Sequence, residues 1–171
     1  MIFTVGHGAQ TAEELADTLR TAGVEVLFDI RRYPGSRRHP HFNSGEMQRW
    51  LADYGVEYRW AESLGGRRQP APGSPNIGLE NEQFRAYADH MATDEFRAGV
   101  AELLEVAETR QVAVMCSETV WWRCHRRLLA DHLQLVVGEP VEHLFPGGRR
   151  YPHAVTEGAT VADRSVIYPP A

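Results

Sequence analysis

Short apolar segments that alternate with helical patterns constrain the fold of this chain more than any other feature. Ile2–Gly6 (IFTVG), residues 25–30 (EVLFDI) and residues 111–115 (QVAVM) are nearly continuous in apolar side chains. Such runs are typical of strands buried on both faces. Strands that alternate with helices predict βαβ units with right-handed crossovers. We therefore expect an α/β three-layer sandwich, with a mainly parallel sheet of about five strands flanked by helices.

The helical segments carry their own start and stop signals. Residues 11–23 predict a helix, because Thr11 and Glu14 have capping-box spacing and Gly23 can end the last turn. Further helices are expected at residues 44–54, 81–91, 93–108 and 124–133, and further strands at residues 56–60 and Val141–Leu144.

The length and the loop composition predict the domain organisation. A chain of 171 residues can form one sizeable core and does not require two. We expect a single α/β domain over residues 1–145 and an extended tail over residues 146–171, packed on the same domain, with a strand at residues 165–169. The Pro/Gly-rich residues 61–80 predict a long loop, and such loops are often lids or binding loops.

The basic residues are unusual in kind and in spacing. The net charge of −5 argues against the broad basic surface that general affinity for nucleic acid or anionic membrane requires. All 18 basic residues are arginine, and many occur in pairs, as Arg31-Arg32, Arg37-Arg38, Arg67-Arg68, Arg126-Arg127 and Arg149-Arg150. The planar guanidinium fits phosphate and carboxylate, so paired arginines in an acidic protein predict a local anion site.

The sequence also restricts the compartment and the partners. No segment approaches the roughly 20 apolar residues of a membrane span, and Met1 leads directly into a strand-like segment. Two cysteines are too few for a disulfide scaffold. We expect a cytoplasmic protein with no membrane partner, no cofactor and a small anionic or nucleotide-like ligand. Nucleic acid is a less favoured partner, and the oligomeric state stays open.

Chemically reactive side chains gather where the predicted strands end. In parallel sheets, ligands bind outside the carboxyl ends of the strands. The residues at or just after these ends are His7, Asp29 to Arg32, Glu62, Gly65 to Arg68, Cys116 to Glu118 and, within the last strand, His143. This placement predicts one shared pocket.

The segment AVMCSETVWWRCHRRLLADHL allows several interpretations. Cys116 and Cys124 could be buried apolar residues, a redox pair or part of a metal site, but with His125 they offer only three metal ligands, and their spacing is not C-x-x-C. An anion-binding loop before a helix is favoured. However, Arg123 follows Cys116 by one residue more than the C-x5-R spacing of phosphatases, and the loop has no glycine. The predicted helix start at Cys124 lacks a capping side chain, which would leave N–H groups free for a ligand.

These observations assign candidate roles without choosing a reaction. The candidate catalytic residues are Glu118, Cys116, His125, His7 and Asp29, and the candidate substrate-binding residues are Arg31, Arg37, Arg38, Arg67, Cys124 and Arg126. Glu118 is favoured over Cys116, because a carboxylate among arginines is best explained by a ligand-linked role. Asp29 could either fix Arg31 or act as a base. No metal site is predicted.

Two functions of different classes follow. The first is a small enzyme, a hydrolase or transferase, that acts on a phosphate-bearing or nucleotide-like substrate. The alternative is a non-catalytic nucleic-acid or nucleotide-binding module linked to DNA repair, in which arginines contact phosphates and Trp121 and Trp122 stack on bases. A third interpretation is a structural protein whose arginines and acids neutralise each other across a cleft.

The ordered motifs TVGHG, DIRRYPGSRRHPHFN, LGGRR, FRAYADHM and VMCSE…RCHRRLLAD resemble the bacterial and archaeal domain-of-unknown-function family numbered 488, over essentially the full length. The resemblance implies an α/β fold and no assigned activity. The family pattern corresponds to Gly6, His7, Asp29, Arg31, Pro34, Asn43, Gly65, Gly66, Cys116, Glu118, Cys124, His125 and Arg126. The segment TVWW departs from the more polar sequence of relatives, which predicts a different pocket size or specificity.

Overall fold

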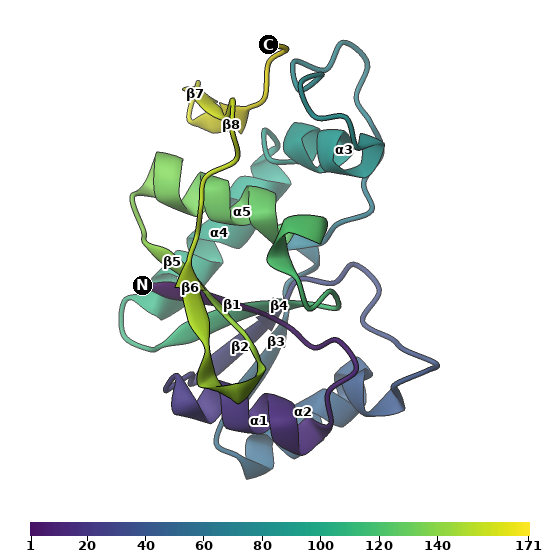
Figure 1. The fold of residues 1–171 in the computed structure, drawn as a ribbon, viewed down its shortest axis with the longest axis vertical. Helices are drawn as coiled ribbons and strands as arrows, with labels where there is room; N and C mark the ends of the chain where they lie inside the picture. Colours follow the sequence, from purple (N-terminus) through teal and green to yellow (C-terminus); the bar gives the residue numbers. More distant parts are fainter.

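A six-stranded sheet in the order β3-β2-β4-β1-β5-β6 divides the molecule into two helical layers (Figure 1). The computed structural model describes all 171 residues. The strands are β1 (Ile2–Gly6), β2 (Val26–Asp29), β3 (Glu57–Trp60), β4 (Val112–Cys116), β5 (Val141–Leu144) and β6 (Arg150–Pro152). The first five are parallel, and β6 pairs antiparallel with β5. The predicted α/β class is confirmed, with one more strand than expected.

Helices cover both faces of the sheet. α1 (Ala12–Thr21) and α2 (Ser44–Asp53) lie on one face, and α4 (Asp94–Ala107) and α5 (Arg126–His132) lie on the other, with α3 (Glu82–His90) beyond them (Figure 1). The helix starts follow the expected chemistry, because the Thr11, Asn81 and Thr93 side chains accept hydrogen bonds from the first turns of α1, α3 and α4. None of the helices combines the length and hydropathy that a bilayer crossing requires.

The central strands supply both halves of the core. Ile2 and Val114 belong to the buried cluster under α4 and α5, whereas their neighbours Phe3 and Met115 belong to the cluster above α1 and α2. Successive side chains of a strand point to opposite faces, so a sheet covered on both sides needs apolar residues at every position. This is why β4 is apolar throughout and β1 is apolar except at Thr4.

The C-terminal tail contributes to the fold in two ways. β6 extends the sheet, and β7 (Thr160–Ala162) and β8 (Ser165–Ile167) form a small antiparallel hairpin. Val166 and Tyr168 are buried in the cluster that contains the α4 and α5 side chains. The strand expected at residues 165–169 is present as β8, whereas β6 and β7 were not expected.

The helix after the second cysteine differs from the prediction at both ends. It begins at Arg126 rather than at Cys124, with His125 as its N-cap residue. It continues past His132 as a π-helical turn, Leu133–Val137, and ends where Gly138 adopts φ 82°. A left-handed residue at this position is the usual way to end a helix.

Candidate functional site

A cavity of about 420 Å³ opens at the carboxyl edge of the parallel strands. The loops that follow β1, β2, β3 and β4 all contribute to its lining, as does the start of α3. The lining residues are His7, Arg31, Arg32, Tyr33, Gly35, Ser36, Gly66, Arg67, Gln83, Phe84, Cys116, Ser117, Glu118, Arg123, Cys124 and His125.

The cavity brings together seven of the eleven candidate site residues, namely His7, Arg31, Arg67, Cys116, Glu118, Cys124 and His125. The other four, Asp29, Arg37, Arg38 and Arg126, do not line it. Gln83 and Phe84 were missed because they follow a long loop rather than a strand end. Arg32 and Arg123 were noticed as parts of motifs but were not assigned to the site.

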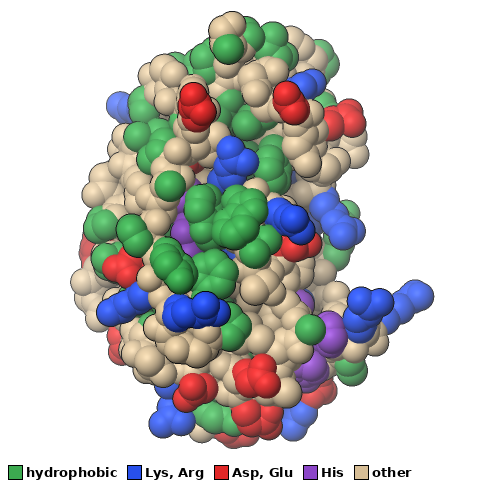
Figure 2. Space-filling view, in the orientation of Figure 1, with side chains coloured by type: hydrophobic (Ala, Val, Ile, Leu, Met, Phe, Trp, Pro, Cys, Tyr) green, Lys and Arg blue, Asp and Glu red, His purple; other side chains and the backbone are tan.

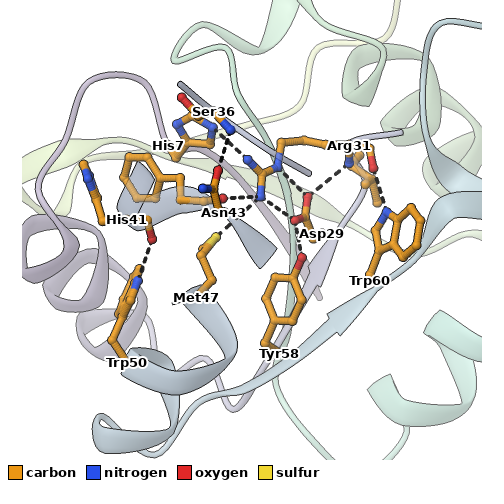
Figure 3. A network of polar contacts seen from close by, with 12 residues as sticks. His7, Asp29, Arg31, Ser36, His41, Asn43, Met47, Trp50, Tyr58 and Trp60 are labelled. Atoms are coloured by element: carbon orange, nitrogen blue, oxygen red, sulfur yellow. Dashed lines mark hydrogen bonds and ion pairs between the residues drawn. The ribbon is translucent and has the colours of Figure 1, made fainter. Parts of the chain in front are cut away.

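Asp29 holds Arg31 in place beneath the cavity (Figure 3). The Arg31 guanidinium donates from Nε to one carboxylate oxygen at 2.8 Å and from NH2 to the other at 2.6 Å. The Tyr58 hydroxyl also donates to Asp29, which is completely buried. Burial opposes the charge on Arg31, but the Asp29 contacts dominate and raise the pKa of Arg31. Of the two roles considered for Asp29, this geometry matches the fixing of Arg31.

His7 presents a hydrogen-bond acceptor at the cavity wall. Its Nδ1 contacts the Gly8 carbonyl oxygen at 2.8 Å, so Nδ1 carries the proton and Nε2 keeps a lone pair. Arg31 NH1 lies 3.4 Å from this Nε2 (Figure 3), and the ring stacks on Phe42 at 4.2 Å. Burial lowers the pKa of His7 to about 4. The imidazole is therefore neutral at neutral pH.

The two cysteines meet at the cavity, and they are not equivalent. Burial raises the pKa of the Cys116 thiol well above its usual value. The Cys116 thiol donates to the Glu118 carbonyl oxygen at 3.6 Å. Burial also acts on Cys124, but the neighbouring Cys116 thiol and the positive charge and backbone N–H of Arg126 outweigh it and lower the pKa of Cys124. Because the thiolate is the reactive form, Cys124 is the better nucleophile of the pair.

His125 completes this arrangement from the adjacent position. Its Nε2 donates to the Ile30 carbonyl oxygen at 2.7 Å, which leaves Nδ1 as an acceptor 3.5 Å from the Cys124 sulfur. Gly66 permits this packing, because a Cβ atom there would lie 2.9 Å from His125 Nδ1. The site therefore contains a thiol with a base beside it.

Arg126 supports the cavity from behind and does not face it. The side chain is fully buried, and NH2 donates to the carbonyl oxygens of Glu118 at 2.7 Å and Thr119 at 3.0 Å. This loop also packs on the end of β1, where a Cβ on Gly6 would lie 1.7 Å from the Glu118 carbonyl oxygen. Arg126 thus fixes the loop that carries Glu118, whose own side chain is exposed and forms no ion pair.

The charge of the cavity is mainly positive. Arg32, Arg67 and Arg123 line it without a carboxylate partner, and Glu118 is the only carboxylate in the lining. Arg67 adopts φ 55°, a left-handed conformation that costs free energy for a residue with a side chain. Strained residues that persist often occur at functional sites. The arrangement suits an anion in the cavity.

A second group of polar residues forms a linear series of hydrogen-bonded contacts inside the protein. Arg126 NH1 donates to Thr4 Oγ1 at 3.3 Å, and Thr4 Oγ1 lies 2.5 Å from His143 Nδ1. His143 Nε2 contacts His153 Nδ1 at 2.9 Å, and His153 Nε2 contacts Asp131 at 2.7 Å. His143 was expected at the cavity but lies in this series, with Trp121 stacked on its ring at 4.3 Å. The face of Trp121 that would stack on a base is therefore already stacked on His143.

Metal ligands do not converge anywhere in the molecule, since no three His, Cys, Asp or Glu side chains are grouped as an ion would require. The reactive groups of the cavity are therefore its thiols, imidazoles and Glu118, surrounded by guanidinium groups.

Comparison with known families confirms the resemblance seen in the motifs. The family described as "Domain of unknown function DUF488" matches residues 11–133, which is well over half of the 171 residues. No curated protein and no solved structure matches the chain. The chain belongs to the DUF488 family.

Proposed function

We propose that this protein is an enzyme that uses Cys124 as a nucleophile on a phosphate-bearing or nucleotide-like substrate bound in the cavity. One observation carries the proposal: a thiol whose pKa is lowered lines a cavity that also contains three arginines without carboxylate partners. Catalytic cysteines in other enzymes are activated by nearby positive charge and by an adjacent base in the same way.

The arginines would bind the substrate before the chemistry. Arg32, Arg67 and Arg123 supply charge to the phosphate oxygens, and Arg31 adds a donor whose position is set by Asp29. His7 Nε2, which accepts from Arg31 NH1, helps to hold that guanidinium toward the substrate. Arg126 acts as a positioning residue, because it holds the loop of Glu118 without lining the cavity.

The reaction would proceed in two displacements. The Cys124 thiolate attacks phosphorus, a sulfur–phosphorus bond forms, and the substrate oxygen leaves with the electron pair of the broken phosphorus–oxygen bond. Water or a second substrate then attacks the phosphocysteine, its proton passes to Glu118, and the thiolate is released. His125 Nδ1, 3.5 Å from the sulfur, takes the thiol proton before the attack and gives it to the departing oxygen in the first displacement.

Alkylation of the thiols tests the site without knowledge of the natural substrate. We expect one iodoacetamide-reactive thiol at pH 7, identified as Cys124 by peptide mass spectrometry, and protection of it by inorganic phosphate or a nucleoside monophosphate. On a phosphoester panel, Cys124→Ser should lower kcat at least about 1,000-fold, as removal of a nucleophile does in other enzymes.

The matched control is Cys116→Ser, since a serine hydroxyl can still donate to the Glu118 carbonyl oxygen, as the Cys116 thiol does, and Cys124 is left in place. This variant should retain both the fast alkylation and its protection by phosphate. If Cys124 reacts no faster than a free thiol and no anion protects it, the proposed nucleophile is wrong.

A further inference from the structure

The loop between β2 and α2 carries two arginines that the cavity does not use. Arg37 and Arg38 are exposed, do not line the cavity and form no ion pair, although the protein as a whole has a net charge of −5. Basic side chains stand on an arm that projects from the body of the molecule (Figure 2), where this loop extends outward in the ribbon (Figure 1). We call residues 33–41 the basic arm.

The basic arm is fixed in position. The Ser36 N–H donates to Asn43 Oδ1 at 2.5 Å (Figure 3), and the His39 N–H donates to Ser36 Oγ at 2.9 Å. At its base, the Ser44 N–H donates to the Pro34 carbonyl oxygen at 3.0 Å. Arg37 and Arg38 therefore stand on an ordered loop, so binding of a ligand to them does not carry the entropy cost of ordering the backbone.

The basic arm is continuous with the cavity. Tyr33, Gly35 and Ser36 line the cavity, and Arg38 lies two residues beyond Ser36, at most about 7 Å along the backbone. A free phosphate or mononucleotide in the cavity would leave Arg37 and Arg38 without a partner. A ligand with several phosphates in a row could contact the cavity and the arm together.

An exposed aromatic ring lies in the lining at the base of the arm. Tyr33 lines the cavity with 64% of its surface exposed, and the Arg32 guanidinium lies 5.8 Å from its ring centroid. Trp60 lies outside the lining and is 49% exposed, and its Nε1 donates to the carbonyl oxygen of Arg31, which does line the cavity (Figure 3). Flat rings beside arginines stack on nucleic-acid bases, and single strands leave their bases free to stack.

We propose that the substrate of the cavity is the phosphorylated end of a single-stranded nucleic acid, whose following phosphates bind Arg37 and Arg38. The inference rests on the proposed function for the terminal phosphate and extends it to the class of substrate. The exposed rings favour this ligand over an acidic peptide, because a peptide offers negative charge but no bases to stack on the rings. The basic residues are confined to one short arm, which matches the backbone of one strand better than the wide surface of a duplex.

Fluorescence anisotropy with a labelled, 5′-phosphorylated single-stranded hexanucleotide tests the proposal. We expect the hexanucleotide to bind at least about tenfold more tightly than the mononucleotide, because more phosphates are contacted. The double variant Arg37→Ala/Arg38→Ala should bind both ligands equally. Its slope of log K against log salt should fall by about 1.4, which is the value for two phosphate contacts on a single strand.

The matched control is Arg149→Ala/Arg150→Ala, which removes the same charge from another exposed pair that does not line the cavity. It should leave the salt slope unchanged. The arm variant should also keep the protection of Cys124 by a mononucleotide, which shows that the fold and the cavity are intact.

The outcomes separate the two proposals. If the mononucleotide protects Cys124 but the hexanucleotide binds no more tightly, or if the arm variant binds it as the wild type does, the inference about the substrate is overturned alone. Equal affinity for duplex DNA or polyglutamate would also overturn it. If no mononucleotide protects Cys124 in the wild-type protein, the proposed function falls and the inference falls with it.

Discussion

The cavity and the buried polar chain use the same kinds of side chain in opposite ways. In the chain that runs from Arg126 through His143 and His153 to Asp131, each group contacts the next within the protein. In the cavity, Arg32, Arg67 and Arg123 face open space without a carboxylate. Polar groups that satisfy one another stabilise a fold, whereas a cluster of cations without partners is best explained by a ligand.

Of the single substitutions, removal of Asp131 should have the largest effect on stability at neutral pH. Its carboxylate accepts hydrogen bonds from the Tyr168 hydroxyl at 2.8 Å and the Thr156 N–H at 3.0 Å, and it contacts His153. Asp131→Ala leaves these buried groups unsatisfied, so we expect the free energy of unfolding to fall by about 3–5 kcal/mol in urea denaturation. The exposed Asp17 provides the control, since Asp17→Ala should change it by less than about 0.5 kcal/mol. If the two variants lowered the free energy of unfolding equally, the buried polar chain would not stabilise the fold as stated.

Acidification should act on both regions through histidines that are buried in the neutral form. Burial lowers the pKa of His7 to about 4 and of His143 to about 2. In the unfolded chain each should titrate near 6.5. The unfolded state therefore binds more protons below that pH, and the free energy of unfolding should fall by about 1.4 kcal/mol per pH unit for each histidine. For His7 this loss ends near pH 4, whereas for His143 it continues toward pH 2.

Urea denaturation at several pH values checks this expectation. His143→Gln should flatten the decline over the whole acidic range, and His7→Gln should flatten it only above about pH 4. A stability that does not change between pH 6.5 and pH 4 would show that neither imidazole is kept neutral by burial.

The smallest expected effect concerns the strained backbone of Arg67. Glycine adopts φ 55° without the penalty that a side chain brings, so Arg67→Gly should raise the free energy of unfolding by about 1 kcal/mol. The same variant should weaken phosphate protection of Cys124, because a cation of the cavity is lost. Arg67→Ala keeps the strain and loses the charge, so it should weaken protection without the gain in stability. A gain in stability from alanine would refute the assignment of strain.

The sequence predicted the fold well because the fold depends on local patterns. Apolar runs, capping residues and strand ends are readable along the chain, and they correctly located β1, β2, β4 and the edge where the cavity opens. β6 was missed because its three residues are exposed and include a proline, so they lack an apolar pattern.

The details of the site depend on contacts that no local pattern encodes. Arg126 looked like a ligand-binding arginine, but it is fully buried and directs the loop of Glu118 and Thr119. The meeting of Cys116 and Cys124 follows from the course of that loop, which their spacing does not determine. The sequence consequently favours Glu118 over Cys116 and counts Arg126 and Cys124 among the substrate-binding residues, whereas the proposed function makes Cys124 the nucleophile.

Tyr168 has a consequence for the order in which the protein can be completed during synthesis. Its N–H donates to Asn76 at 2.9 Å, its carbonyl oxygen accepts from the Gly78 N–H at 2.9 Å, and its hydroxyl donates to Asp131 at 2.8 Å. This one residue near the C-terminus thus joins the long loop before α3 to α5. Since domains emerge from the ribosome N-terminus first, the core above the sheet stays open until Tyr168 has been translated, and a nascent chain would expose that core to chaperones in the interval.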